Sequence, residues 1–360
     1  MLKIIVLILG ILVGQALAQH RGIWIVRNSL NTKEDLKQLE RIHQKLQLTD
    51  VYVQVRALGE NVYSAPMASR LTLNEIVEFC HRNGIKAHAW INVFYIWSKN
   101  KAPRNPNHPF LQDVDHLLSD WSSEEPVLKN LKKKGVEGYF VDPRAFTNKA
   151  QIERLLNQLL TQYQFDGIHL DYIRYPGKGV IFSKHLRTLF MKKYFIDPLL
   201  FFKEKTFNPE GQSLYRNFLL NELNNFVENF KNVVRQIDES CVVTMAVKPD
   251  IDRAKFEYYQ DWVNWLKQGS GDYVLMMNYS PDENVFRKNL LKAEQLIGKN
   301  NVVCGIGAYY LDGENLEKRI KLVEALQFKG YALFSFTTLK NKPELLTTID
   351  QRQTIKIQTY

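Results

Sequence analysis

The stretch Phe165-Asp-Gly-Ile-His-Leu-Asp-Tyr-Ile-Arg-Tyr-Pro176 decides the fold. Its apolar and β-branched residues predict a short strand over residues 165–173. The segment before it has the apolar spacing of an amphipathic helix, with Ile152, Leu155, Leu156, Leu159, Leu160 and Tyr163 on one face. A helix that leads into a strand with an aspartate near its carboxyl end, Asp171, is typical of an α/β fold.

The same alternation of strand and helix runs along the whole chain. Eight runs rich in β-branched or aromatic residues are predicted as strands: residues 22–28, 50–57, 85–92, 165–173, 242–248, 273–279, 302–309 and 331–336. Amphipathic patterns predict helices between them, one after the possible N-cap Thr32 and others at residues 71–83, 214–237, 262–267, 286–297 and 316–326. Eight repeats favour a parallel sheet with right-handed crossovers that closes into a (β/α)8 TIM barrel.

One domain is enough for this chain. We assign residues 19–345 to the barrel, because barrels commonly use 200 to 250 or more residues as one unit. Hydrophobic residues make up 45% of the sequence, which is sufficient for a large core. An open dinucleotide-binding sheet is disfavoured, since no G-x-G-x-x-G follows the first strand.

Two connections are too long for simple loops between a strand and a helix: residues 93–148 and 177–212. Both follow the carboxyl ends of strands, so we expect them to rise over the catalytic face of the barrel as cleft walls or a lid. The first carries aromatic residues that would either stack on sugar rings or form a small core inside the excursion: Phe94, Tyr95, Trp97, Phe110 and Trp121. We expect at least one of Trp90, Trp97 and Trp121 to be a sugar-stacking platform.

Polar side chains recur inside the second and third predicted strands. The period of two places four of them toward the barrel interior: Gln54, Arg56, His88 and Asn92. A purely structural barrel would fill these positions with Val, Ile or Leu, because buried polar groups need hydrogen bonds or water. The pattern therefore indicates a site, with Arg56, Trp90 and Asn92 as substrate-binding residues.

Asp171 is the main candidate for the chemistry. It follows an apolar run at the end of a strand, where a carboxylate nucleophile or base is held rigidly and partly desolvated. Arg174 and Tyr175 come directly after it and could orient it or stabilise its charge. The alternative is an aspartate that caps the next turn. Asp166 stands at the other end of the strand, before Gly167, which favours a structural role.

Three motifs accompany this segment: Arg21-Gly-Ile-Trp24, Val53-Gln-Val-Arg56 and Ala89-Trp-Ile-Asn92. Together with residues 166–176 they resemble the glycosyl hydrolase-like family 10 proteins, and the resemblance extends from Arg21 to about Phe336. It implies an exported, carbohydrate-active (β/α)8 barrel. Asp171 matches the acidic position of that family at the end of the fourth strand.

The same segment is more distantly similar to the motif D-G-x-D-x-D-x-E of family 18 chitinases, and Met277-Asn-Tyr279 is similar to their M-x-Y. Asp166 and Asp171 match, but His169 replaces the middle aspartate and Ile173 stands where the acidic glutamate should be. Without that acid the substrate-assisted reaction of the chitinases cannot be transferred. The similarity implies a shared architecture.

Glycoside hydrolysis generally needs a second carboxylate about 5 to 9.5 Å from the first. Four candidates follow predicted strands or lie in loops of the same face: Asp250, Asp282, Asp142 and Glu60. Asp250 is the first choice because its strand neighbours that of Asp171, although it could instead pair with Lys248. The remaining expected substrate-binding residues are His169, Arg174, Tyr175, Lys248, Asn278, Tyr279 and Asp282. His169 could equally be a hydrogen-bonded core residue.

Charge and composition limit the partners. The net charge is +10, but the basic residues are scattered, and the cluster Lys132-Lys-Lys134 is typical of a solvated helix end. We therefore expect no nucleic-acid partner, whereas attraction to anionic cell-wall or uronic-acid polymers fits the charge. No Asp/His trio has ligand spacing, so we expect no metal and no cofactor. Three cysteines without C-x-x-C spacing are interpreted as packing residues: Cys80, Cys241 and Cys304.

The amino terminus predicts export. Lys3 precedes an apolar run over residues 4–13, and Ala16-Leu-Ala18 fits a signal-peptidase site. We expect a signal peptide over residues 1–18, a mature protein that begins at Gln19 without a lipobox cysteine, and a short tail over residues 346–360. No second apolar stretch of about 18 residues follows, so we expect a secreted or periplasmic protein without stable membrane insertion.

The leading function is hydrolysis of O-glycosidic bonds in a polysaccharide or cell-wall glycan, centred on Asp171. The alternative is a glycan-binding barrel without catalysis, because an acidic partner of Asp171 is not evident. A polysaccharide lyase, a deacetylase and a nucleic-acid binder are weaker hypotheses. Release of reducing ends from a panel of polymers would separate the first two.

Overall fold

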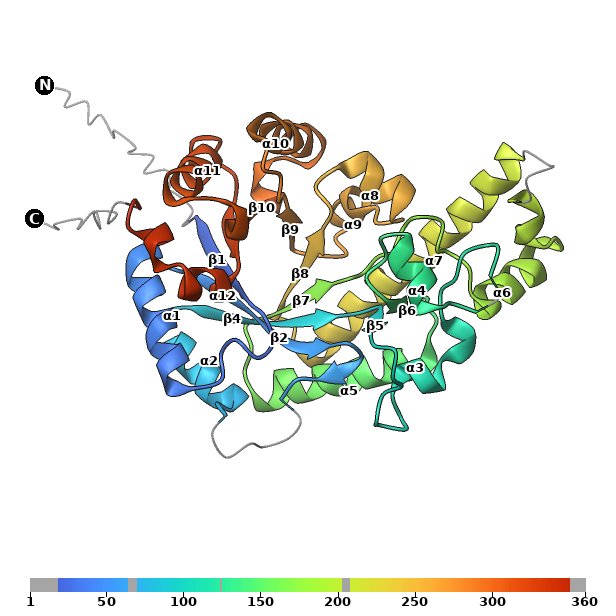
Figure 1. Cartoon of the computed structure of the whole chain (residues 1–360), viewed down its shortest axis with the longest axis horizontal. Coiled ribbons are helices and arrows are strands. Elements are labelled where there is room, and N and C mark those ends of the chain that lie inside the picture. Colours follow the sequence, from blue (N-terminus) through green and yellow to red (C-terminus); the bar gives the residue numbers. More distant parts are fainter. Residues whose placement is uncertain (1–18, 64–69, 124, 203–207, 350–360) are drawn as a thin grey trace, which may run out of the picture.

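A closed barrel of eight parallel strands forms the centre of the computed structural model, which describes residues 19–63, 70–123, 125–202 and 208–349 (Figure 1). Around the barrel the strands follow the order β1, β2, β4, β7, β8, β9, β10, β11, and β11 pairs with β1 to close the ring. Their bounds are β1 His20–Ile25, β2 Asp50–Ala57, β4 Lys86–Asn92, β7 Gly167–Asp171, β8 Val242–Val247, β9 Tyr273–Met277, β10 Val302–Gly307 and β11 Gly330–Phe334. The predicted (β/α)8 barrel is confirmed.

Helices surround this barrel on its outer side (Figure 1). Those that follow or connect its strands are α1 Lys33–Leu46, α2 Leu73–Arg82, α5 Phe146–Gln162, α7 Pro209–Ile237, α8 Ile251–Glu257, α9 Trp262–Lys267, α10 Glu283–Ile297, α11 Gly313–Ala325 and α12 Phe336–Asn341. The side chain of Thr32 caps α1 in a reciprocal capping box with Asp35, as its sequence position predicts. Thr72 and Glu75 form the same arrangement at the start of α2.

The two long excursions pack against each other beside the barrel mouth, on the right of Figure 1. The first holds β5 Tyr95–Trp97, α3 Pro109–Gln112, α4 Leu128–Lys133 and β6 Tyr139–Phe140, and β5 and β6 form a small antiparallel sheet. The second holds α6 Lys184–Tyr194, and an isolated bridge joins Ser119 to Phe182 between the excursions. Lys134 is the C-cap of α4, so the lysine cluster does lie at a helix end.

Aromatic side chains, rather than aliphatic ones, fill much of the barrel interior. Trp24, Tyr52, Trp90 and Tyr273 form one buried cluster with Leu275, Val303 and Ala332. Below it, the buried carboxylate of Asp50 lies 2.9 Å from His20 Nδ1 and 2.8 Å from His88 Nε2. Side chains therefore fill the interior near the amino ends of the strands, whereas active sites of such barrels lie at the carboxyl ends.

Gly167 at the start of β7 illustrates how tightly this lower layer is packed. A Cβ atom there would meet the ring of His88 and lie 2.6 Å from the carbonyl oxygen of Val242. We expect Gly167→Ala to lower the free energy of unfolding by about 1–3 kcal/mol, because an added methyl group must push apart a filled core. Urea unfolding followed by far-UV circular dichroism measures this change. An unchanged midpoint would contradict the packing described here.

The three cysteines are free and buried, in agreement with their interpretation as packing residues. In the ranges that the structure describes, no helix combines the length and the apolar character needed to cross a membrane. Within the same ranges, no group of three or more His, Cys, Asp or Glu side chains is placed to hold a metal ion. The predicted signal peptide, residues 1–18, and residues 350–360 of the predicted tail lie outside the described residues.

Candidate active site

A cavity of about 340 Å³ opens at the carboxyl ends of the barrel strands. Six of the predicted site residues line it: Trp90, Asn92, Asp171, Arg174, Lys248 and Tyr279. They come from the ends of β4, β7, β8 and β9 or from residues shortly after these ends. The barrel therefore brings together side chains that are far apart in the sequence, on the face where such barrels carry their active sites.

Asp171 is the last residue of β7, and its side chain is held from two directions. The backbone N–H of Tyr172 donates to Oδ1 at 2.6 Å, and Trp90 Nε1 donates to Oδ2 at 3.2 Å. Tyr172 adopts a left-handed conformation with φ of 55°. Such conformations are uncommon for residues other than glycine and gather at functional sites, where surrounding structure enforces them.

The environment of Asp171 shifts its acidity. Burial raises the pKa of this carboxyl to about 6, although the hydrogen bond from the Tyr172 N–H and the charges of Arg174 and Lys248 act in the opposite direction. Burial and the nearby Arg174 lower the pKa of Lys248 to about 8. At neutral pH Asp171 is therefore mostly ionised, yet it can take up a proton within one or two pH units.

Amide side chains from β2 and β4 line the cavity together with Asp171. Asn92 on β4 is the register partner of Asp171 on β7. Gln54 Nε2 donates to Asn92 Oδ1 at 3.2 Å, and Gln54 Oε1 accepts from the Arg27 N–H at 3.0 Å. Of the polar residues predicted inside β2 and β4, Gln54 and Asn92 are thus hydrogen-bonded to each other at the cavity, and His88 is paired with Asp50 below it.

Glu137, which the sequence analysis missed, supplies the second carboxylate of the cavity. It lies in the first excursion, just before β6, and its side chain is 40% exposed. Glu137 Oε1 accepts a hydrogen bond of 2.7 Å from Arg174 Nη2. Arg174 is buried and packs over the rings of Phe140, Tyr172 and Tyr258. Arg174 thus connects the excursion to the strand end that carries Asp171.

His169 lies one layer below the cavity. Its Nε2 accepts a hydrogen bond of 3.0 Å from Trp24 Nε1, and its Nδ1 lies 2.9 Å from Thr244 Oγ1. Burial lowers the pKa of His169 well below its usual range, so the ring is neutral. Its predicted contact with substrate is not supported, and the structure agrees with the alternative of a hydrogen-bonded core residue.

Arg56 does not face the cavity, because a β-bulge changes the direction of its side chain. The pairing of β2 with β4 shifts between Gln54 and Arg56, so that Arg56 is opposite Ile91. One extra residue in a strand moves the following side chain to the other face of the sheet. Arg56 is buried between the barrel and its helices, where Nη2 donates to Asn148 Oδ1 of α5 at 2.8 Å.

The predicted acidic partners of Asp171 lie outside the cavity. Asp250 is the N-cap of α8 and accepts from the Arg253 N–H at 3.1 Å, while Asp282 caps α10 in the same way. Asp142 is fully buried within the excursions, 2.9 Å from His116 Nδ1 and 2.6 Å from Ser183 Oγ. Glu60 is exposed on the short strand β3, Glu60–Asn61. None of the four lines the cavity, whereas Glu137 does.

Two further residues predicted to bind substrate, Asn278 and Tyr175, do not line the cavity. Asn278 is buried and bridges to α10, where its Nδ2 donates to the Phe286 carbonyl oxygen at 2.9 Å. Tyr175 is buried against Tyr259. Asp166 accepts from the Ala87 N–H at 2.8 Å at the opposite end of β7, in agreement with its predicted structural role.

The tryptophans separate into different environments. Trp90 and Trp24 line the cavity, whereas Trp121 is 39% exposed elsewhere. Trp97 is buried, and its Nε1 donates to the Lys101 carbonyl oxygen at 2.9 Å. Trp97 therefore belongs to the small core inside the first excursion, which was the alternative interpretation of these aromatic residues.

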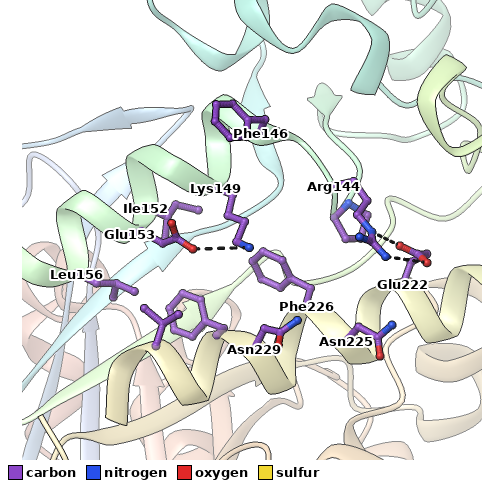
Figure 2. A pocket seen from close by; sticks show the side chains of 13 residues that line it. Arg144, Phe146, Lys149, Ile152, Glu153, Leu156, Glu222, Asn225, Phe226 and Asn229 are labelled. Atoms are coloured by element: carbon purple, nitrogen blue, oxygen red, sulfur yellow. Dashed lines mark hydrogen bonds and ion pairs between the residues drawn. The ribbon is translucent and has the colours of Figure 1, made fainter. Parts of the chain in front are cut away.

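A second cavity, of about 320 Å³, lies on the outer wall of the barrel between α5 and α7 (Figure 2). Its cations are paired with carboxylates, Arg144 with Glu222 and Lys149 with Glu153. Apolar side chains such as Ile152 and Phe226 line the space between these pairs. It contains no group from a strand end, so we place the candidate active site in the barrel mouth.

The sequence model of the family described as Glycosyl hydrolase-like 10 matches residues 19–310. The chain belongs to this family. No curated protein matches the chain in sequence. Membership agrees with the resemblance seen in the motifs around Asp171.

Solved structures share the fold of this family member at low sequence identity. The catalytic domain of beta-amylase from Paenibacillus polymyxa has a TM-score of 0.58 and 11% identity, covering 89% of this chain and 93% of that one. Alpha-L-fucosidase isoenzyme 2 from Paenibacillus thiaminolyticus has a TM-score of 0.62 and 13% identity, covering 91% and 48%. A chitinase from Bacteroides thetaiotaomicron has a TM-score of 0.50 and 10% identity, covering 95% and 98%. These similarities establish the barrel fold alone.

Proposed function

We propose that this protein hydrolyses O-glycosidic bonds of a polysaccharide or cell-wall glycan. One observation supports the proposal above all: Asp171, a buried carboxyl with a pKa of about 6, shares the barrel-mouth cavity with a second carboxylate, Glu137. Two carboxyl groups in different environments are what glycoside hydrolysis requires. Membership in the glycosyl hydrolase-like 10 family agrees with this chemistry.

Each cavity residue has a role in the proposed reaction. Asp171, ionised at neutral pH, acts as the nucleophile or as the base that activates water. Glu137 is the proton donor to the departing sugar oxygen, since it is the other carboxylate among the described residues of the cavity. Trp24 and Trp90 line the cavity with the small exposed part of otherwise buried rings, which gives a bound sugar an apolar surface to contact. Such a substrate lies outside the cell, which fits the export that we propose from residues 1–18.

Product analysis in ¹⁸O-labelled water tests the reaction class. Hydrolysis places one labelled oxygen in the two products of each cleavage, so mass spectrometry of fragments from a polysaccharide panel should show a gain of one labelled water. Fragments that lack this water and carry an unsaturated sugar would instead identify a lyase. Loss of acetyl groups without chain cleavage would identify a deacetylase.

A glycan-binding barrel without catalysis is the second candidate, and one contact favours it. Glu137 is bound to the guanidinium of Arg174 at 2.7 Å, so its carboxyl group is engaged by a neighbouring side chain instead of being free to approach a sugar oxygen. If this pairing persists with glycan in the cavity, the polymer would be bound but not cut. The polysaccharide panel separates the two candidates when binding and cleavage are measured on the same polymers.

Activity should depend on pH through Asp171. The ionised form is the reactive one in our proposal, and its pKa is about 6, so only about a tenth of the carboxyl is ionised at pH 5. We therefore expect kcat/KM to fall about tenfold for each pH unit below 6. The pH profile of kcat/KM reports groups of the free enzyme, so this measurement applies directly. A flat profile between pH 4.5 and 7 would exclude the role given to Asp171.

A further inference from the structure

We propose that the barrel-mouth cavity recognises an acidic sugar, whose anionic group is bound by Lys248 with help from Arg27. This inference rests on the proposed function, since it assumes that a glycan occupies the cavity. It goes further by naming the chemical class of the sugar. A uronic acid, with its carboxylate on the sugar ring, is the substituent that we assign.

The cavity contains more positive than negative groups. Three cations line it, Arg27, Arg174 and Lys248, together with the two carboxylates Asp171 and Glu137. Arg174 is paired with Glu137, so this couple is neutral. Asp171 is close enough to Lys248 to feel its charge, and the five groups together carry one net positive charge when all are ionised. A uronic acid would be attracted by this positive charge and would offset it, whereas a neutral sugar would do neither.

Lys248 is the cation with the clearest need for a partner. Among the described residues, no carboxylate oxygen lies within 4.0 Å of its Nζ, which sits 4.9 Å above the ring of Tyr258. Its backbone is fixed, because its N–H donates to Gln260 Oε1 at 2.8 Å and its carbonyl oxygen accepts from Trp262 Nε1 at 3.2 Å. The burial that lowers the pKa of Lys248 also strengthens its attraction to an anion that enters the cavity.

Arg27 lies across the barrel mouth from Lys248. It follows the end of β1, whereas Lys248 follows the end of β8, and β2, β4 and β7 lie between those strands. The guanidinium of Arg27 is exposed and has no ion pair within 4.0 Å among the described residues. Its backbone is held by the hydrogen bond to Gln54. Arg27 can therefore attract an acidic chain from solvent. The less exposed Lys248 makes the contact that distinguishes an acidic sugar from a neutral one.

Paired oligosaccharides with the same backbone test the inference. The probes are oligogalacturonates and oligoglucuronates with free carboxylates, and the same chains as methyl esters, with sulfated and desulfated galactan oligosaccharides as a third pair. Affinity at pH 6.5 is followed by the fluorescence of the cavity tryptophans. We expect at least tenfold tighter binding of the free uronates than of their esters. Tighter binding of sulfated chains than of uronates would assign the site to sulfate and overturn the assignment to a uronic acid.

Variants connect the preference to Lys248. Lys248→Met should reduce the preference for the free acid to below about threefold, and Lys248→Arg should retain it. Lys292→Met is the matched control, because it removes one positive charge from an exposed lysine that pairs with Asp252 outside the cavity. A loss of preference in the control would mean that overall charge, not this site, is responsible. Equal affinity of wild type and Lys248→Met for the uronates would also overturn the proposal.

A pH series gives an independent readout. Lys248 loses its charge as the pH rises through about 8, so the preference for the free acid should decline between pH 7 and 9. A preference that stays constant up to pH 9 would contradict the role of Lys248.

Failure of this inference is distinct from failure of the proposed function. Binding or cleavage of neutral chains alone would end the assignment to an acidic sugar. No binding and no cleavage of any glycan would end both proposals.

Discussion

Asp171→Asn should lower kcat by roughly 100-fold to 10,000-fold, the range typical of a positioned proton-transfer group, and by more if Asp171 forms a covalent intermediate. Substrate binding should survive, because the amide keeps the shape of the side chain. Thermal stability should hold or rise, since a buried carboxylate whose pKa is raised to about 6 costs free energy in its ionised form. Steady-state kinetics, binding and thermal unfolding on the same preparation measure these three quantities.

Asp250→Asn is the matched control for this substitution. Asp250 also follows a barrel strand, but it caps α8 outside the cavity, and asparagine is as good an N-cap as aspartate. The control should keep nearly full activity. Full activity of Asp171→Asn on a substrate that the wild type cleaves would end the proposal, and an unfolded Asp171→Asn protein would favour a purely structural aspartate.

Glu137→Gln should lower kcat on polymers by about 100-fold or more, because the cavity then lacks its second group for proton transfer. The loss of kcat should be much smaller on a nitrophenyl glycoside. Its leaving group, nitrophenolate, departs without taking up a proton. Comparison of kcat for the two substrate types measures this difference.

Arg174→Met separates proton transfer from positioning. This variant removes the ion pair of Glu137 but leaves its carboxyl group in place. If Glu137 serves only to position Arg174, Glu137→Gln and Arg174→Met should lose activity equally. The loss should then be the same on polymers and on nitrophenyl glycosides. That pattern would assign Glu137 a structural role and favour the glycan-binding barrel.

The barrel could be predicted because its strands are local features of the sequence. All eight predicted strands are present with ends shifted by a few residues, and the predicted span of α9, residues 262–267, matches the structure. Asp171 could be placed for the same reason, since a strand end is visible in the pattern of apolar residues. Ile173 is fully buried, so the position of the missing chitinase glutamate is occupied by a core residue.

The errors at the site come from features that local patterns do not contain. The period of two placed Arg56 inside the barrel, but the bulge after Gln54 turned it outward, and nothing in the composition of β2 indicates a bulge. Asp250 follows β8, and β8 does pair with β7, as predicted. Lys248, directly after β8, lines the cavity, whereas Asp250 does not. Two residues after Lys248 the chain already begins a helix.

Glu137 was missed because tertiary contacts determine its position. It stands in an excursion, 34 residues before Asp171 in the sequence, and reaches the cavity through the pairing of β5 with β6 and through Arg174. The only available signal was that the excursion follows the carboxyl end of β4 and so belongs to the catalytic face. Long loops over that face should therefore be searched for carboxylates as carefully as the strand ends.

The number of new reducing ends that the purified protein releases from a panel of acidic and neutral polysaccharides tests the central claim most directly. We expect release from at least one polymer by the wild type and by Asp250→Asn, and almost none by Asp171→Asn. Binding of a polymer by all three proteins without any release of reducing ends would contradict the account and establish a glycan-binding barrel instead.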